Sequence, residues 1–269
     1  MKVHDVSERR ACKTIGQARS TQRYSHKPNE FKEKLRAAII EAASEYGRYG
    51  YRKVTEHLNL EGWNVGKDRV YTIWREEGLK IPQKQPKRSR LWFNDGSCIR
   101  LRAEYPNHVW SYDFVQDRTD DGRSFRILNI IDEYTKECLC SLTQRRINSQ
   151  DVILELAELF LTKGIPEHVR SDNGPEFVAK KLMKWFETLE VQPLFITPGS
   201  PWENGYCESF NGKMRYEFLN GEIFNSLFEA QVLIERWKVH YNTKRPHSSL
   251  GGKPPIPQTL QPDLKLLAM

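Results

Sequence analysis

Apolar residues recur at helical spacing between residues 31 and 77 and predict three short helices. The first helix carries them at i, i+4, i+7, i+8 and i+11, as Phe31, Leu35, Ala38, Ile39 and Ala42. Glycines separate the helices, because glycine ends a helix readily. Three short helices with a tight turn between the last two are typical of a helix-turn-helix unit. The pattern is also compatible with a small helical packing domain.

The third helix is the element of such a unit that enters the major groove of DNA. It is expected from about Lys67 to Glu77, and its outward positions include Lys67, Arg69 and Arg75. We therefore expect these three cations to contact DNA. Asp68 lies among them and would repel phosphate, so not every exposed position of the helix can be a contact.

From residue 106 onward, short β-prone runs alternate with helical patterns. Strands are expected over Val109–Arg118, Phe125–Ile131, Cys138–Gln144, His168–Ser171 and Val191–Ile196. Helices are expected from Asn148 or Ser149 to about Thr162, from about Glu176 to Leu189, and through Glu208. Three strands, then helix, strand, helix, strand and further helices favour an α/β layer fold with a mixed sheet.

The chain therefore divides into five expected segments. They are a basic N-terminal tail (1–30), which could include a short helix, the helix-turn-helix segment (31–80), a basic linker (81–105), the α/β domain (106–250) and a C-terminal tail (251–269). The linker region is rich in Lys and Arg, which fits either a segment that follows a DNA backbone or a solubilising tether.

Charge is divided unevenly along the 269 residues. Residues 1–105 carry 23 Lys and Arg against 13 Asp and Glu, whereas residues 106–269 carry 19 against 22. Neutralisation of phosphates supplies most of the sequence-independent affinity for DNA, so the basic part is expected to bind DNA. A solvated basic surface is the alternative.

The five cysteines show no C-x-x-C spacing, which argues against a disulfide framework and a zinc site and fits a reducing compartment. Cys138 and Cys140 are two apart in an expected strand, so they should share one face as small apolar residues. The sequence has neither an apolar signal segment nor a charge-free run long enough to span a bilayer. We therefore expect a soluble, cytoplasmic protein with no membrane partner.

Three acidic residues occur in contexts that suggest a metal site. Asp113 lies within the first strand, in VWSYDFV, where a charge is costly unless it is paired or bound to a metal. Asp172 follows the fourth strand in VRSDNGPEF, and Glu208 lies on a helix in SPWENGYCESFNGKMR. Two Mg²⁺ ions that cleave a phosphodiester require carboxylate ligands from several elements. Taken singly, each acid is more often an ordinary surface carboxylate.

The helix that carries Glu208 has one polar and one apolar face. At 100° per residue, Asn204, Asn211, Gly212 and Arg215 fall within about 60° of Glu208. Such a stripe suits a metal and a phosphate, so Asn211 and Arg215 are candidate DNA contacts.

Two neighbouring residues are further candidates for contact with DNA. Lys213 would touch either phosphate or only solvent. Trp202, in the loop before the helix, would either stack on a base freed at a DNA end or pack under its own loop.

Together these motifs resemble the DDE transposases that have a retroviral-integrase-like core. They are most similar to the OrfB product of the IS-three family of insertion sequences. The segments LNLEGWNVGKDRVYTIWREEGL and YNTKRPHSSLGGKPP are also typical of that family, so the resemblance covers nearly the whole chain.

The resemblance implies an RNase H-like core with a mixed five-stranded sheet and flanking helices, preceded by the helix-turn-helix segment. It implies that Asp113, Asp172 and Glu208 are catalytic residues that bind Mg²⁺ or Mn²⁺, as two ions, and that Arg215 contacts DNA near the scissile phosphate. The implied activity is DNA cleavage and strand transfer at the ends of an insertion sequence. The implied partners are DNA, further copies of the chain, and an OrfA protein or an OrfAB frameshift fusion.

Two alternatives remain from the sequence. One is an integrase of another mobile element, which would share the same core. The other is a DNA-binding regulator of the element without catalytic activity, which would not need three intact acids.

Overall fold

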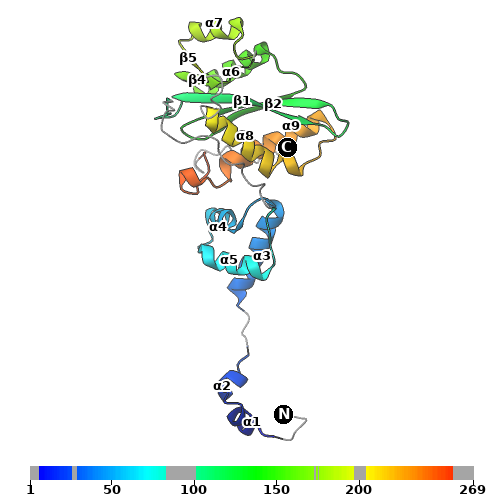
Figure 1. The fold of residues 1–269 in the computed structure, drawn as a ribbon. Helices are drawn as coiled ribbons and strands as arrows, with labels where there is room; N and C mark the ends of the chain where they lie inside the picture. The colour runs from blue at the N-terminus through cyan, green and yellow to red at the C-terminus, as the bar shows by residue number, and fades with distance from the viewer. Residues whose placement is uncertain are drawn as a thin grey trace, which may run out of the picture.

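The computed structural model of the protein describes residues 6–25, 29–82, 101–172, 174, 176–196 and 204–256. Its helical elements before the sheet are α1 (Glu8–Thr14), α2 (Arg19–Gln22), α3 (Glu30–Glu45), α4 (Tyr51–Leu60) and α5 (Lys67–Glu76) (Figure 1). The strands are β1 (Val109–Arg118), β2 (Ser124–Asp132), β3 (Cys138–Gln144), β4 (His168–Ser171) and β5 (Gln192–Phe195). The other helices are α6 (Ser149–Lys163), α7 (Lys180–Thr188), α8 (Gly205–Glu217) and α9 (Leu227–Thr243), with short 3-10 turns at Leu219–Gly221 and Ser248–Leu250.

Residues 8–22 form two short helices where the sequence predicts a basic tail. The side chain of Ser7 accepts a hydrogen bond from the backbone N–H of Arg10 and caps α1. Glu8 pairs with Arg23 and Arg19 and so joins α1 to α2. The helices have seven and four residues, which is too short for a repeated apolar spacing to show in the sequence.

Helices α3, α4 and α5 pack around a shared apolar core, as the sequence predicts. Leu35, Val54 and Ile73, one from each helix, are almost completely buried in it. The side chain of Asn29 caps α3 by accepting a hydrogen bond from the N–H of Lys32. These helices form the segment expected to bind DNA.

The five strands form one mixed sheet in the order β3-β2-β1-β4-β5, which confirms the expected α/β class. β1, β2 and β3 are antiparallel neighbours, whereas β4 and β5 run parallel to β1. The first connection is a tight turn in which Gly122 has a φ of +77°, a conformation that glycine adopts without strain.

Helices cover both faces of the sheet (Figure 1). On one face, Tyr112 and Leu128 pack with Leu156 of α6 and Phe186 of α7. On the other face, an apolar cluster joins β1, β2 and β3 to α8 and α9. Strand residues alternate between the two clusters, so Asp113, next to Tyr112, lies on the side of α8.

Cys138 and Cys140 lie on opposite faces of the sheet, so the expectation that they share one face is wrong. Cys138 belongs to the cluster under α8 and α9, and Cys140 to the cluster under α6. A β-bulge is the reason: Ile130 and Ile131 are adjacent on β2, yet they pair with Cys140 and Cys138 on β3. The extra residue on β3 shifts the alternation by one position.

The helical segment docks on the α8–α9 side of the sheet domain. The Tyr49 hydroxyl lies 2.9 Å from Nε2 of His240 on α9. Tyr46 stacks on the same imidazole with ring centroids 4.7 Å apart. The structure therefore shows direct contacts between the expected DNA-binding segment and the helices that cover the face carrying Asp113.

The end of the linker is attached to the sheet. Nη2 of Arg170 on β4 donates a hydrogen bond of 2.7 Å to the carbonyl of Leu101. Arg170 also pairs with Glu133, and both side chains are buried. Most of the expected linker, residues 83–100, lies outside the described residues. Within the described part of the chain, no helix is long and apolar enough to cross a membrane.

Candidate active site

Asp113 lies in the middle of β1, half-buried beneath α8. Its Oδ1 accepts a hydrogen bond of 2.7 Å from the backbone N–H of Phe114, and its Oδ2 accepts one of 2.9 Å from Nδ2 of Asn211. The pKa of Asp113 is raised to about 6: burial raises it most, and the charges of Asp172 and Glu208 add to this, whereas the two hydrogen bonds lower it. Asp172 and Glu208 are thus close enough to Asp113 to act on its ionisation.

Asp172 comes directly after β4, the strand that runs parallel to β1. Ser111 of β1 pairs with Arg170 of β4. Asp113 and Asp172 each lie two residues further along these parallel segments and are therefore neighbours. The backbone N–H of Gly174 donates a hydrogen bond of 3.0 Å to Oδ1 of Asp172. A Cβ at residue 174 would lie 3.1 Å from the same oxygen, so glycine allows the loop to close around this carboxylate.

Glu208 lies in the first turn of α8, and its side chain is exposed. Partial burial raises the pKa of this carboxyl. The neighbouring residues Cys207 and Phe210 are buried against β1 and β2, which fixes the side of the helix that Glu208 presents. A strand, the loop after a strand and a helix therefore each carry one acid, and the charges of Asp172 and Glu208 both act on Asp113.

This donor set fits a divalent metal ion. Hard cations such as Mg²⁺ prefer carboxylate oxygens, and a bound cation would favour the ionised form of Asp113, whose pKa is raised by burial and by the charges of Asp172 and Glu208. Asn211 and the N–H of Phe114 occupy one lone pair on each oxygen of Asp113 and leave further lone pairs available.

A second group of possible metal ligands lies at the other end of β1 and β4. Ligand atoms of His108, Glu167 and His168 lie within 4.8 Å of one another. However, Nδ1 of His108 accepts a hydrogen bond of 3.1 Å from the backbone N–H of Glu104. The neutral ring then carries its proton on Nε2, so neither nitrogen has a free lone pair for a metal. The Tyr105 hydroxyl donates a hydrogen bond to Glu167. These side chains therefore attach the end of the linker to the sheet.

Arg215 and Asn211, which the helix angles predict to lie on the side of Glu208, both bond to β1. Nη2 of Arg215 donates a hydrogen bond of 2.6 Å to the carbonyl of Gln116, and its Nη1 lies 3.8 Å from Asp117. The Arg215 side chain is 45% exposed, so part of the guanidinium is accessible to a ligand. Both heteroatoms of the Asn211 amide are already hydrogen-bonded within the protein.

Lys213 lies on another side of α8, and the structure does not bring it together with the three acids. Its pKa is lowered to about 8, mainly by burial and then by the nearby positive charge of Arg245. Lys53 of α4 is among the charges that act on it, so Lys213 lies near the contact between α8 and the helical segment. Trp202 lies outside the described residues.

Lys67, Arg69 and Arg75 are all exposed on α5, as predicted. Cζ of Arg69 lies 5.6 Å from the centroid of the Phe31 ring, and Cζ of Arg75 lies 5.9 Å from that of Tyr71. Tyr71 itself is 43% exposed, so an accessible aromatic ring lies beside the basic residue Arg75.

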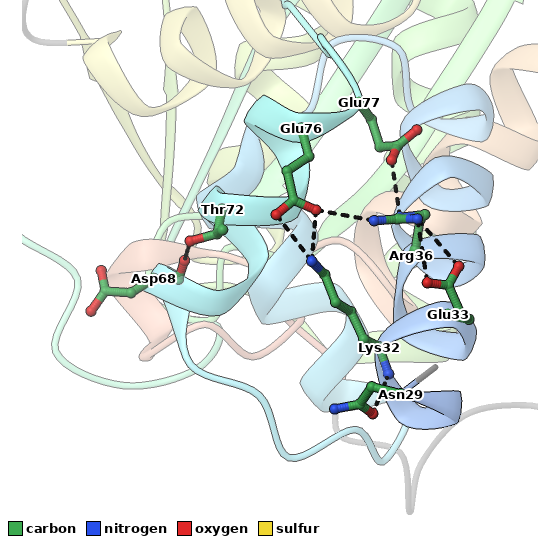
Figure 2. A network of polar contacts seen from close by, with 8 residues as sticks. All are labelled: Asn29, Lys32, Glu33, Arg36, Asp68, Thr72, Glu76 and Glu77. Carbon is green, nitrogen blue, oxygen red and sulfur yellow. Dashed lines mark hydrogen bonds and ion pairs between the residues drawn. The ribbon is translucent and has the colours of Figure 1, made fainter. Parts of the chain in front are cut away.

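Glu76 and Glu77, at the end of α5, point toward Lys32 and Arg36 of α3 (Figure 2). Lys32 and Arg36 of α3 both pair with Glu76, at 2.9 and 3.0 Å, and Arg36 also pairs with Glu77 at 3.0 Å. These bonds cross from α5 to α3 and partly neutralise the two acids. The exposed cations of α5 are therefore offset by less acidic charge than the composition of the helix indicates.

Two groups beside the acids were not among the sequence candidates. Asn129 of β2 is fully buried and bonds to Asn211. Arg126 pairs with Glu176 in the loop after Asp172, and its Cζ lies 3.8 Å from the centroid of the Phe114 ring. Asn129 could have been found as the one amide inside the apolar run RILNIID.

The mixed sheet with helices on both faces, preceded by a helical segment, has the RNase H-like architecture of integrase catalytic cores. The match to the integrase core domain family and the relatives described below define the protein as a polynucleotidyl transferase. The integrase core domain family matches residues 103–201 and, in a second match, residues 189–255. That family is generally metal-dependent. The HTH-like domain family matches residues 30–87, which confirms the expected helix-turn-helix character of the helical segment.

Several relatives of the chain are proteins of insertion elements. An uncharacterized 31.7 kDa protein of insertion element IS407 from Burkholderia multivorans is 36% identical over 247 residues, which cover 92% of this chain and 88% of the relative. Transposase InsD for insertion element IS2D of Escherichia coli is 28% identical over 232 residues, 81% of this chain and 75% of the relative. The chain belongs to the family of insertion-element transposases that combine an HTH-like domain with an integrase core domain.

A solved structure shares this fold. A chain of the simian T-cell lymphotropic virus intasome, determined in complex with PP2A regulatory subunit B56 gamma, has a TM-score of 0.51 and 18% sequence identity. The match covers 84% of this chain and 76% of the viral chain. It therefore includes much of the protein and not the sheet alone.

Proposed function

We propose that Asp113, Asp172 and Glu208 bind two Mg²⁺ or Mn²⁺ ions and that this site cleaves and joins DNA at the ends of an insertion sequence. The observation that supports this role most strongly is the convergence of three carboxylates from β1, the loop after β4 and α8. Burial raises the pKa of Asp113, and the charges of Asp172 and Glu208 act in the same direction, so a bound cation would offset this cost of ionising Asp113.

When bound, the metal ions supply a nucleophilic oxygen and stabilise the leaving oxygen of a phosphodiester. The residues of the chain position the reactants. Phe114 and Asn211 hold the two oxygens of Asp113, and Gly174 holds one oxygen of Asp172. The exposed part of the Arg215 guanidinium is placed to bind a phosphate of the DNA strand next to the site.

Recognition of the DNA end is proposed for the helical segment. Lys67, Arg69 and Arg75 of α5 are exposed cations on the second helix of the helix-turn-helix pair. Two element ends must be brought together before they can be joined, so we propose that copies of the chain assemble on DNA. An OrfA protein, or an OrfAB fusion, is the proposed additional partner.

The proposed function is tested with linear DNA that carries the two sequences flanking the gene of this protein, incubated with the full chain and Mg²⁺. We expect nicking at the element ends followed by strand transfer, and complete loss of both in Asp113→Asn, Asp172→Asn and Glu208→Gln. Asp120→Asn, an exposed acid in the turn after β1, is the matched control and should retain activity. Strand transfer that survives any of the three substitutions would contradict the proposed site.

A further inference from the structure

One line of polar side chains crosses the face of the sheet beneath α8. Asp113 of β1 pairs in register with Asn129 of β2, and Asn129 pairs with Ser141 of β3. Opposite residues of antiparallel strands point to the same face, so the three side chains lie in a row. Asn129 is 0% exposed, and the residues two positions away on its strand, Ile127 and Ile131, belong to the apolar cluster of that face.

Hydrogen bonds join this row to Asn211 of α8. Nδ2 of Asn211 donates to Oδ2 of Asp113 at 2.9 Å, and Nδ2 of Asn129 donates to Oδ1 of Asn211 at 2.8 Å. The Ser141 hydroxyl in turn donates to Oδ1 of Asn129 at 2.8 Å. Four side chains from three strands and one helix thus form a continuous chain of bonds that ends at Asp113.

The ionised carboxylate sets the direction of every bond in this chain. A carboxylate only accepts hydrogen bonds, so Asn211 must turn its NH₂ group toward Asp113 and its oxygen toward Asn129. Asn129 must then present its own NH₂ group to Asn211, which leaves its oxygen for Ser141. If Asn211 turned over, its oxygen would face the carboxylate, and the two acceptors would repel each other.

Packing of the sheet against α8 does not require an amide at residue 129. A β-branched apolar residue such as its neighbours would pack there without any polar group to satisfy, whereas a buried amide without partners costs about 1–3 kcal/mol. Nδ2 of Asn129 donates to Asn211, and Oδ1 of Asn129 accepts from Ser141. Both heteroatoms of this amide are thus used in the chain of bonds that orients Asn211. The amide at residue 129, in place of an apolar side chain, is therefore connected through Asn211 to the carboxylate of Asp113.

We propose that Asn129 is a positioning residue that orients Asn211 and, through it, the carboxylate of Asp113 for metal binding. The inference rests on the proposed function, since it assumes that Asp113 binds the metal. Asn129 touches neither metal nor DNA in this scheme. Its contribution is to hold Oδ2 of Asp113 in one place, in the way that hydrogen-bonded neighbours of metal ligands commonly tune metal affinity.

The test compares Mn²⁺ binding by the wild-type full chain, Asn129→Leu and Ser141→Ala, measured by electron paramagnetic resonance without DNA. Asn242→Leu is the matched control, because Asn242 is also a buried amide that bonds to β3, through both backbone groups of Cys138, and lies away from the acids. Asp113→Asn marks which part of the Mn²⁺ signal belongs to the proposed site. Circular dichroism gives the melting temperature of each variant.

We expect Asn129→Leu to weaken Mn²⁺ binding about tenfold or more, as is typical when a neighbour of a metal ligand is lost. Ser141→Ala should weaken it less, and Asn242→Leu should lower the melting temperature but bind Mn²⁺ as the wild type does. Wild-type affinity in folded Asn129→Leu, or equal weakening in Asn242→Leu, would overturn the inference. If Asn129→Leu does not fold, Ser141→Ala decides: unchanged Mn²⁺ affinity in this variant would overturn it.

Failure of the proposed function gives a different result. If Asp113→Asn retains the whole Mn²⁺ signal, Asp113 is not a metal ligand, and both proposals are rejected. If Asp113→Asn loses the signal and the DNA cleavage while Asn129→Leu retains both, only the positioning role is rejected.

Discussion

Lys53 of α4 and Glu217 of α8 form an ion pair, with Nζ of Lys53 2.5 Å from Oε1 of Glu217. Arg245 binds the same carboxylate through two bonds of 2.6 Å, and the Glu217 side chain is only 7% exposed. The helix that carries Glu208 at its beginning is thus attached at its end to the HTH-like helical segment. Burial alone would raise the pKa of Glu217, but Arg245 and Lys53 lower it to about 2.

Glu217→Gln should destabilise the protein at neutral pH. Because the pKa of Glu217 is below its ordinary value, the ionised group stabilises the fold above about pH 4.5, and this stability is lost as the pH falls toward 2. Breaking the buried pair should cost about 3 kcal/mol at pH 7, and much less near pH 3. Urea unfolding at the two pH values measures the difference. Glu187→Gln, an exposed acid on α7, should change the stability little at either pH.

The His240 imidazole should make the contact between the helical segment and the sheet domain sensitive to acid. Burial lowers the pKa of His240 to about 4, so the neutral ring is the form that packs against Tyr46 and Tyr49. A depressed histidine pKa means that stability is lost as the pH falls below about 6.5 toward 4. His240→Phe should flatten the fall in melting temperature between pH 6.5 and pH 4. An unchanged slope would show that His240 does not govern this contact.

Asp113→Asn should stabilise the metal-free protein although it abolishes activity. The pKa of Asp113 is raised to about 6, so its contribution to stability is present below about pH 4 and is lost as the pH rises through 6. At pH 7.5 without metal the variant should unfold at a higher temperature than the wild type, by the equivalent of about 1–2 kcal/mol. The gap should close near pH 4. Mg²⁺ should raise the melting temperature of the wild type and leave that of the variant unchanged.

Gly174→Ala should slow DNA cleavage in a protein that still folds. The new Cβ would lie 3.1 Å from Oδ1 of Asp172 and 3.3 Å from Cδ2 of Phe177, so the carboxylate has to move by a few tenths of an ångström. Displaced catalytic groups lose rate steeply, and we expect a loss of about tenfold in single-turnover cleavage. Gly221→Ala, where a Cβ meets no atom within 4 Å, is the control and should cleave normally.

Removal of the α5 cations should change how DNA affinity depends on salt. Each lysine or arginine that neutralises a phosphate contributes about one unit to the slope of log K against log salt concentration. Lys67→Ala, Arg69→Ala and Arg75→Ala should each reduce the slope by about that amount in fluorescence anisotropy titrations. Lys184→Ala, an exposed cation on α7, should leave it unchanged. Equal slopes in all four variants would place the DNA on another surface.

Much of the fold follows from local patterns. The bounds of β1, β3 and β4 agree with those expected, because alternating or continuous apolar runs between turn residues define a strand locally. Helix α7 begins at Lys180 and not at Glu176, since the carbonyl of Gly174 accepts hydrogen bonds from the N–H groups of Phe177 and Val178 in a turn. This turn belongs to the loop around Asp172, and the spacing of apolar residues does not reveal it.

The site was less predictable where it depends on pairing between elements. Helix angles placed Asn211 and Arg215 on the side of Glu208, because that relation is internal to α8. They could not show that the side with Lys213 faces the charges of Lys53 and Arg245, which come from distant parts of the chain. Asn129 joins the site only through the register of β1 and β2, and register is not readable from one sequence.

The order of the elements along the chain has a consequence for synthesis. α8 and α9, which cover the face that carries Asp113, come after all five strands. A ribosome releases the helical segment and both aspartates before Glu208 emerges. With the roles proposed for these residues, the growing polypeptide would bind nearby DNA before it is able to cut it, and an early stop in translation would yield a DNA-binding protein without cleavage activity.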